Sequence, residues 1–462
     1  MRRRTWLSAF ALTALAVVAA APQGAAVGDE RERQFSYAGL TTDPRWVNDT
    51  EGLNRELLKD GVRPATMGLE SPRGADSPPT VSDPTREQEL AQRHGATYAA
   101  PSEQHTAPAP ANRYDYITPQ ECRNNWRVSS RDQGWIKNHF AYCQLFVLYN
   151  KTERCFVICF TTGAFTAKVT VVGYGKREVM PGSAAHRFTD YALDMTEVRA
   201  SGRFREATTM LDVQAHCQGW PNANACQMAG PNGKYTNLPT WIAQPTTSFR
   251  AYSPAQPADQ AHGEQKATGV MRITYRFTVP GTVSIPDRVV GSEMGMRFDS
   301  AWYLPARQGS IFDRVTPYIT FRLSDEPVKM SARHLSDAIN HPEATEPKVP
   351  GKLLPGGSAE NPLRRLYHDS ARRTANRAEA TSFCHRRWPG YPELGQDCDE
   401  FPFASTYEGA ARYKYDGDRW RDHFSARPIN APDNQEAGSR LGAWYGNDRI
   451  LDGDRFFVRV VN

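Results

Sequence analysis

Between residues 114 and 325 the chain repeats short runs that are rich in β-branched and aromatic residues. AYCQLFVLY begins at Ala141, AKVTVVGY at Ala167 and VMRITYRFTVPG at Val270, and Gly, Pro and Asn separate such runs. Punctuated runs of this kind are typical of antiparallel strands, and the third shows apolar residues at alternate positions. The pattern predicts a β-rich domain, sandwich- or barrel-like, over residues 114–325. Its role cannot be read from these residues.

The first residues have the layout of a secretory signal peptide. Arginines at positions 2–4 precede an apolar run over residues 6–21, and small residues follow at 24–26. A membrane anchor is the alternative, but the run is short for a span of ~20 residues and is rich in Ala. We therefore expect residues 1–26 to be a signal peptide and the mature chain to be secreted. No membrane partner is expected once the signal is removed.

All eight cysteines follow this leader, which fits an oxidising compartment. Their spacing does not match a zinc site, so disulfide bonds are expected rather than a metal centre. Proximity in the sequence predicts the disulfides Cys384–Cys398 and Cys217–Cys226. The pairing stays open for the remaining four, which are Cys122, Cys143, Cys155 and Cys159.

Composition divides the rest of the chain into three parts. Residues 27–113 carry few large apolar side chains, which predicts a disordered or pro-peptide-like arm. Residues 326–360 become rich in Pro and Gly toward their end and predict a linker. Residues 361–462 have the helix and strand signals of a small, independent α+β domain.

Helix signals in this last domain come in two places. The pair Asn361-Pro362 suits an N-cap and a first turn, which predicts a helix to about residue 380. Asp433 and Glu436 resemble a capping box at the start of a second helix. Gly446 is the predicted end of that helix. Its predicted buried face consists of Ala437, Leu441, Trp444 and Tyr445. Two further strands are predicted at residues 424–429 and 455–461.

Charge in the C-terminal domain is uneven. Residues 361–387 hold seven arginines against two acids, whereas residues 388–462 hold nine basic and thirteen acidic residues. Arginines position nucleic-acid phosphates, so Arg372, Arg373 and Arg377 are candidates for that role. A solvated basic helix face is the alternative. The net charge of +5 is too small to indicate nucleic acid by itself.

The most informative motif is CDEFPFASTYEGA at residues 398–410, which places Asp399, Glu400 and Glu408 among aromatic side chains. Carboxylates held in an apolar frame suit general-base and metal chemistry. A second polar cluster, PDNQEAGS, begins at Pro432.

Three segments that follow one another along the chain resemble the NucA/NucB family of secreted bacterial deoxyribonucleases. They are CDEFPFASTYEGA, SARPINAPDNQEAGSRLGAWY and LDGDRFFVRVV. The resemblance covers the C-terminal domain and does not reach the β-rich region. It implies a small α+β nuclease with a ββα-metal-like site, which cuts DNA with one divalent cation.

By motif position, the resemblance implies roles for individual residues. Asp399 would be the base that activates water, and Glu400 could replace it, because neighbours on a strand face opposite sides. Glu408 and Asn434 would bind Mg²⁺ or Mn²⁺ at the reacting phosphate, since these ions prefer oxygen donors. Asp433 belongs to the same Asp-Asn pair and is a further candidate ligand.

Structural alternatives stay open for several of these residues. Asp433 could serve only to cap a helix, and Glu408 with the following Gly could form a plain turn. Arg427 could clamp a phosphate or could be a charge at a strand edge. His385 and His423 lie outside the matched segments and are weaker candidates for the base.

The sequence thus predicts a secreted, divalent-metal-dependent DNA endonuclease with little sequence preference, because phosphate contacts carry no sequence information. The alternative is a surface-binding or toxin-type effector whose β-rich domain recognises an unknown partner. A degenerate nuclease should have lost carboxylates from its motif, whereas this motif keeps Asp399, Glu400 and Glu408.

Overall fold

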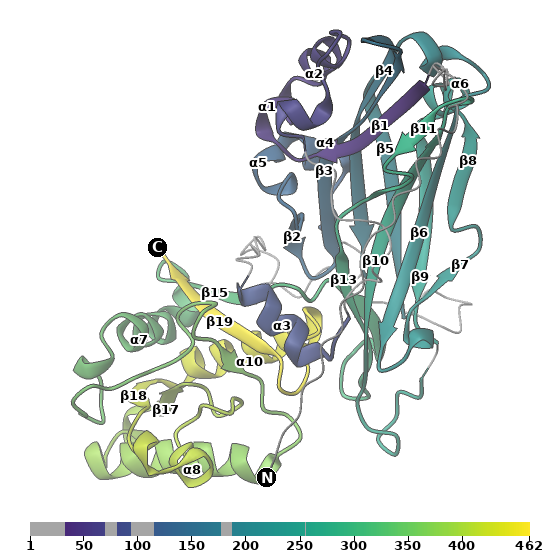
Figure 1. Cartoon of the computed structure of the whole chain (residues 1–462). Coiled ribbons are helices and arrows are strands. Elements are labelled where there is room, and N and C mark those ends of the chain that lie inside the picture. Colours follow the sequence, from purple (N-terminus) through teal and green to yellow (C-terminus); the bar gives the residue numbers. More distant parts are fainter. Residues whose placement is uncertain (1–32, 70–80, 94–114, 177–186, 255) are drawn as a thin grey trace, which may run out of the picture.

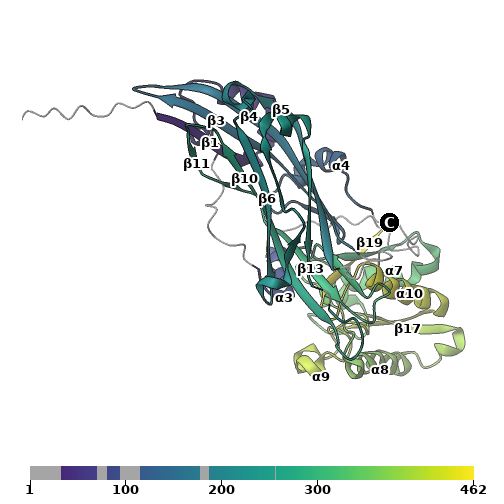
Figure 2. The same ribbon diagram turned by 90° about the vertical axis from the view of Figure 1, so that its right-hand side faces the viewer.

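The computed structural model describes residues 33–69, 81–93, 115–176, 187–254 and 256–462. They form a long β-rich domain and a smaller α+β domain that packs beside one end of it (Figures 1 and 2). No helix among these residues is long and apolar enough to cross a membrane. The predicted signal peptide, residues 1–26, lies outside the described residues.

The β-rich domain consists of two curled sheets that share one core. The first sheet has the strand order β11-β1-β3-β4-β5-β9-β7, with β2 paired to β3. Its strands are β1 (Arg33–Thr41), β2 (Trp135–Asn138), β3 (Ala141–Cys155), β4 (Cys159–Tyr174), β5 (Phe188–Ala200), β7 (Gln227–Ala229), β9 (Thr246–Tyr252) and β11 (Val283–Ile285). The second sheet has the order β14-β13-β10-β6-β8, with β12 paired to β10. Its strands are β6 (Met210–Trp220), β8 (Gly233–Asn237), β10 (Gln265–Thr278), β12 (Val289–Val290), β13 (Met294–Ser300) and β14 (Gln308–Ile311).

Large side chains from both sheets fill the core. Phe146 of β3 contacts Tyr275 of β10, with ring centroids 5.8 Å apart. Ile273, Tyr275 and Phe277 are all buried, and they are the alternate positions that the strand pattern assigned to one face. The prediction of a β-rich domain is confirmed. The short α6 (Leu238–Ala243) closes one end of the second sheet, with Trp241 in the core.

The expectation of a disordered arm over residues 27–113 is wrong for its described parts, residues 33–69 and 81–93, whereas a pro-peptide role stays a prediction. β1 pairs with β3 along its whole length, from Arg33↔Cys155 to Thr41↔Val147. Helices α1 (Pro44–Asn48) and α2 (Thr50–Leu57) then cover the outer face of the sheet. The segment has few apolar residues, but Val47, Leu53 and Leu57 are fully buried there. The other elements near this face are η1 (Pro64–Met67), α4 (Pro119–Asn124) and α5 (Trp126–Ser129).

The α+β domain begins before its predicted start. β15 (Tyr318–Arg322) pairs in parallel with β19 (Arg455–Val461), and β16 (Leu363–Arg364) pairs with the other edge of β19. Helix α7 (Lys329–Asn340) packs on α10 (Ala431–Asn447). The predicted boundary at residue 325 and the linker over residues 326–360 are therefore wrong. The Pro and Gly residues of this segment lie mainly after α7, and their number makes the whole segment resemble a linker although a helix precedes them.

The other elements of this domain agree in part with the sequence. The predicted helix over residues 361–380 is wrong at its start, because α8 (Ser370–Arg387) begins after its cap Asp369 and β16 precedes it. α10 begins at Ala431 behind the cap Asn430, and Asp448 rather than Gly446 ends it. The buried face predicted for α10 is confirmed. The remaining elements are β17 (Gln396–Phe401), β18 (Ser425–Asn430) and α9 (Tyr413–Asp416), and β18 and β19 confirm the predicted strands.

The eight cysteines form four disulfides. Cys384–Cys398 and Cys217–Cys226 are present as predicted. The pairs left open by the sequence are Cys122–Cys143 and Cys155–Cys159.

A buried ionic network joins the two domains. Arg297 of β13 donates to Asp454 at 2.6 Å and to the carbonyl of Arg449 at 2.8 Å. Arg449 in turn pairs with Asp299 of β13. The side chains of Arg297, Asp299 and Arg449 are all fully buried. At the same junction, α3 (Pro84–Arg93) contributes an ion pair between Glu89 and Arg455 at 3.0 Å. Breaking one partner of such a network leaves an uncompensated buried charge, so the network holds the domains in one arrangement.

Candidate active site

A cleft of about 860 Å³ opens in the α+β domain between α8 and α10. Strand β17, which pairs with β18, lines the cleft, and β18 leads directly into α10. The polar side chains that line it include Arg373, Thr374 and Arg377 from α8, Asp397, Asp399 and Glu400 from β17, and Asn434 and Gln435 from α10; Ser331, Arg365, Tyr367, Thr381, Ser405 and Tyr445 line it as well. The cleft therefore brings together the acidic motif, the Asp-Asn segment and two of the predicted arginines.

Strand β17 presents Asp399 and Glu400 to different helices. Asp399 reaches α7, and Glu400 lies 3.9 Å from Arg377 of α8. This divergence follows from the alternation of side chains along a strand. The Cys384–Cys398 disulfide ties β17 to α8 next to both carboxylates, so the strand is fixed where the acids leave it.

His334 is the functional residue that sequence reasoning missed. It lies on α7, is fully buried, and contacts Asp399 through Nδ1 at 2.8 Å and the Ser425 hydroxyl through Nε2 at 2.7 Å. A neutral imidazole satisfies both contacts, because Nδ1–H donates to the carboxylate and Nε2 accepts from the hydroxyl. The spacing of Ser331, His334 and Leu335 on one helical face is a signal that could find it, but the Pro and Gly content of residues 326–360 predicts a linker instead.

Glu400 is a strongly perturbed carboxyl group in the cleft. Burial raises the pKa of its carboxyl to about 7, and the neighbouring Asp399 charge adds to the rise while Arg377 opposes it. A carboxyl with a pKa near neutral pH is suited to general-base catalysis. One oxygen of Asp399 is already held by His334, whereas no side chain among the described residues donates a hydrogen bond to Glu400. The geometry thus favours Glu400 over Asp399 as the base.

Glu408 lies outside the cleft. Its two carboxylate oxygens accept hydrogen bonds from the Arg364 amide and from Arg364 Nε, both at 2.8 Å, and its side chain is buried. These contacts hold β16 against the loop that follows β17. Both oxygens of Glu408 are engaged in these contacts, and the residues that line the cleft include Asn434 but not Glu408.

The Asp-Asn pair divides between two tasks. Both oxygens of Asp433 accept amide hydrogens at the start of α7, from Met330 at 2.8 Å and Ser331 at 2.9 Å. Asp433 thus caps α7 rather than its own helix, which Asn430 caps. Asn434 is half-buried and lines the cleft, so it is the member of the pair that can meet a ligand.

The predicted phosphate-binding arginines are also divided. Arg373 and Arg377 line the cleft, and 69% of the Arg377 side chain is exposed. Arg372 is buried, where it donates to the Tyr407 carbonyl and pairs with Asp416 at 3.1 Å. Arg427 pairs with Asp337 of α7 at 2.7 Å. The other two histidines considered from the sequence, His385 and His423, do not line the cleft.

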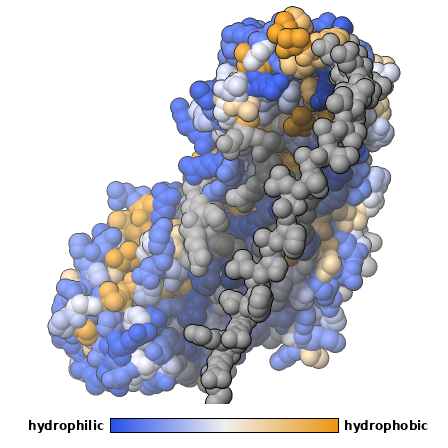
Figure 3. Space-filling view, in the orientation of Figure 1, coloured by the Kyte–Doolittle hydropathy of each residue, from blue (hydrophilic) through white to orange (hydrophobic). Residues whose placement is uncertain are grey.

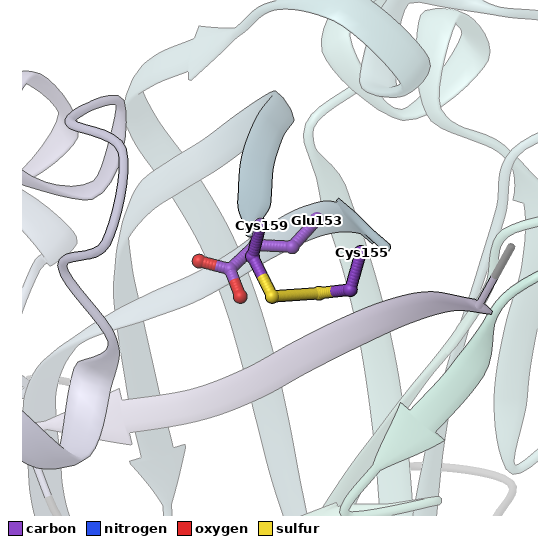
Figure 4. Close-up of side chains that lie close together, drawn as sticks. All are labelled: Glu153, Cys155 and Cys159. Atoms are coloured by element: carbon purple, nitrogen blue, oxygen red, sulfur yellow. A yellow bond between two sulfur atoms is a disulfide. The ribbon is translucent and has the colours of Figure 1, made fainter. Parts of the chain in front are cut away.

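The donors in the cleft suit a hard divalent cation. Asp399, Glu400 and Asn434 offer oxygen atoms, and Mg²⁺ is commonly held by one or two carboxylates while it keeps several waters. Over the described residues, three potential ligands of the His, Cys, Asp or Glu type come within reach of one ion only at Glu153, Cys155 and Cys159 in the β-rich domain. Figure 4 shows that these two cysteines are joined in a disulfide, so they have no thiolate to offer a metal.

Buried carboxylates beside exposed arginines are a combination suited to phosphodiester hydrolysis, because arginines bind phosphates and carboxylates can bind a cation or accept a proton. Residues 358–459 match the family model of deoxyribonuclease NucA/NucB. The C-terminal domain is accordingly a NucA/NucB-type nuclease domain, and the family implies a hydrolase that acts on DNA. No curated protein and no solved structure matches the chain. β15, α7 and His334 all precede the matched residues.

Proposed function

We propose that this protein is a secreted, divalent-metal-dependent DNA endonuclease that hydrolyses phosphodiester bonds with little sequence preference. The observation that carries the proposal is the buried Glu400 beside Asp399 and Arg377 in a cleft of the domain that matches the nuclease family. The four disulfides fit export to an oxidising compartment, as does the predicted signal peptide.

Glu400 acts as the general base. With a pKa of about 7 it is substantially ionised at neutral pH, yet it remains basic enough to accept a proton from a water molecule. Arg377, 3.9 Å away, stabilises the ionised form and is exposed enough to contact a phosphate at the same time. The water molecule that gives up this proton lies beside Glu400 of β17, inside the cleft.

Asp399 and Asn434 supply the oxygen atoms that would hold Mg²⁺ or Mn²⁺. When bound, such an ion neutralises the charge that develops on the reacting phosphate. His334 holds Asp399 in one orientation through the 2.8 Å contact and is itself fixed by Ser425. This support resembles the hydrogen bonds that orient metal ligands in other proteins.

Arg373 and Arg377 bind the phosphates on either side of the scissile bond. They project from one side of α8 into the cleft, one helical turn apart. Contacts of this kind fix the register of the DNA backbone but do not read bases, so we expect cleavage at many sequences.

A plasmid-nicking assay with the whole chain tests the proposal. Nicking should require Mg²⁺ or Mn²⁺ and should stop with EDTA. Glu400→Gln should lower the rate by at least about 100-fold, the usual contribution of a general base. Glu393→Gln, which removes an exposed acid near β17, is the matched control and should cut normally. Nicking in EDTA, or full activity of Glu400→Gln, would refute the proposal.

A further inference from the structure

The hairpin of β3 and β4 ends in an exposed apolar loop. Cys155 and Cys159 pair across its base, and the loop between them consists of Phe156, Val157 and Ile158. Their exposed fractions are 61%, 95% and 60%, and Phe160 just beyond is 53% exposed. Among the described residues this is the only place where consecutive large apolar residues are exposed. We call residues 156–160 the apolar tip.

The tip is built to keep these side chains in solvent. Tight turns favour Gly, Asn, Asp and Ser, so a loop of Phe, Val and Ile is unusual. The disulfide closes the loop at its base, and the Phe156 amide donates to the Ile158 carbonyl at 3.1 Å. A loop constrained in this way cannot fold its apolar side chains back onto the sheet. Contiguous exposed apolar surface of this kind marks an interaction site.

The tip lies at the pole of the β-rich domain that faces away from the nuclease domain. In Figure 1 the β3–β4 hairpin rises to the top of the picture, whereas α8 and α10 lie at the lower left. Figure 3 shows an apolar patch at the same upper end. A surface or a molecule that binds the tip would therefore leave the cleft of the α+β domain accessible.

The surroundings of the tip carry positive charge. Arg33 is the register partner of Cys155, Arg154 precedes it, and Arg63 lies 3.6 Å from the Cys159 sulfur. The nearest acid, Glu153, is fully buried and is neutralised by Lys151 at 3.0 Å and by Arg63 at 3.4 Å. Figure 4 shows its carboxylate beside the disulfide, behind the loop. Asp60 is an exposed acid near the tip and accepts the Thr161 amide at 2.7 Å.

The described part of the chain begins at the same pole, because Arg33, its first residue, pairs with Cys155 at the end of β3. The Arg33 side chain is exposed and adds to the positive charge at the base of the tip.

The size of the tip also favours lipid over a protein partner. Four partly exposed side chains present on the order of 400 Å², whereas each partner in a standard protein interface contributes ~800 Å². A short apolar loop with basic neighbours matches instead the requirements for shallow insertion among anionic lipids. We infer that the apolar tip inserts into the outer layer of an anionic lipid bilayer and holds the protein at that surface. Such a contact differs from a membrane span, and no helix among the described residues is long and apolar enough to form one.

Vesicle flotation tests this inference with the chain from residue 27 onward, which lacks the predicted signal peptide but keeps every described residue. The protein should float with vesicles of phosphatidylglycerol and phosphatidylethanolamine, and less with phosphatidylcholine alone. Val157→Asp should reduce flotation at least 10-fold, because it places a charge in the acyl region. Leu394→Asp is the matched control, since Leu394 is 75% exposed in the nuclease domain and should not matter.

Three outcomes would overturn the inference. The protein could fail to float with either kind of vesicle, or Val157→Asp could float as well as the unchanged chain. The unchanged chain could also dimerise in sedimentation without binding vesicles, and lose the dimer in Val157→Asp, which would make the tip a protein contact. Plasmid nicking by Val157→Asp should equal that of the unchanged chain, which separates this inference from the proposed catalytic role.

Discussion

Replacing Glu400 by Gln should stabilise the protein at neutral and alkaline pH while it removes catalysis. Burial raises the pKa of this carboxyl from its ordinary value of 4.5 to about 7. Between these two values the folded state retains a proton that the unfolded state has released, so stability falls as pH rises through this window. A shift of this size corresponds to about 3 kcal/mol at pH 8. Gln has the shape of the protonated acid and carries no charge to bury, so it does not incur that cost.

Urea unfolding followed by circular dichroism, in EDTA at pH 4 and pH 8, measures the effect. The difference between Glu400→Gln and the unchanged chain should be close to zero at pH 4 and about 3 kcal/mol in favour of the variant at pH 8. Glu393→Gln should differ by less than about 0.5 kcal/mol at both pH values, because its side chain is exposed. The assignment of a carboxylate whose charge is destabilised by burial would be contradicted by a variant that is less stable than the unchanged chain at pH 8. A gain in stability that does not depend on pH would contradict it as well.

Three further substitutions test other parts of the structure. His334→Gln should lower kcat or metal affinity by about 10- to 100-fold, measured by nicking at varied Mg²⁺, because Asp399 loses its support; unchanged kinetics would refute that role. Arg297→Ala should destabilise the protein by about 3–5 kcal/mol in thermal unfolding, because the buried Asp454 and Asp299 both lose their ion pair with Arg297; a loss below about 1 kcal/mol would refute the junction as a fixed contact. Arg377→Ala should weaken DNA binding and reduce the salt slope by about one, measured by fluorescence anisotropy in EDTA, and an unchanged slope would exclude a phosphate contact.

The parts of the fold that follow from local pattern could be predicted from the sequence. The strands β18 and β19, the buried face of α10 and two disulfides depend on residues close together in the chain, and the structure confirms them. Asn361-Pro362 and Asp369 both suit a helix start, so local pattern alone predicts the start of α8 too early in the chain. Residues 363–364 pair with β19 instead, and the helix begins only after Asp369. Long-range partners of this kind leave no trace in local composition.

The candidate site shows the same division. The acidic motif and the Asp-Asn pair locate the cleft, because both segments contribute to its lining. The motif does not show that Glu408 bonds to the backbone of β16 or that Asp433 caps α7, since those partners lie 44 and more than 100 residues away. Carboxylates are equally suited to accept amide hydrogens and to bind cations, so residue type alone cannot separate the two roles.

Helix α7 explains why several residues of the nuclease motifs are not free to meet DNA. Asp433 caps its first turn, Asp399 bonds to His334 in its middle, and Arg427 pairs with Asp337 one turn later. Each contact joins α7 to a different element of the hairpin-helix unit that builds the cleft. The helix therefore fixes the position of β17 relative to α10, although it precedes the residues that match the nuclease family. We therefore expect the functional unit of this domain to include α7, and also β15, which pairs with β19.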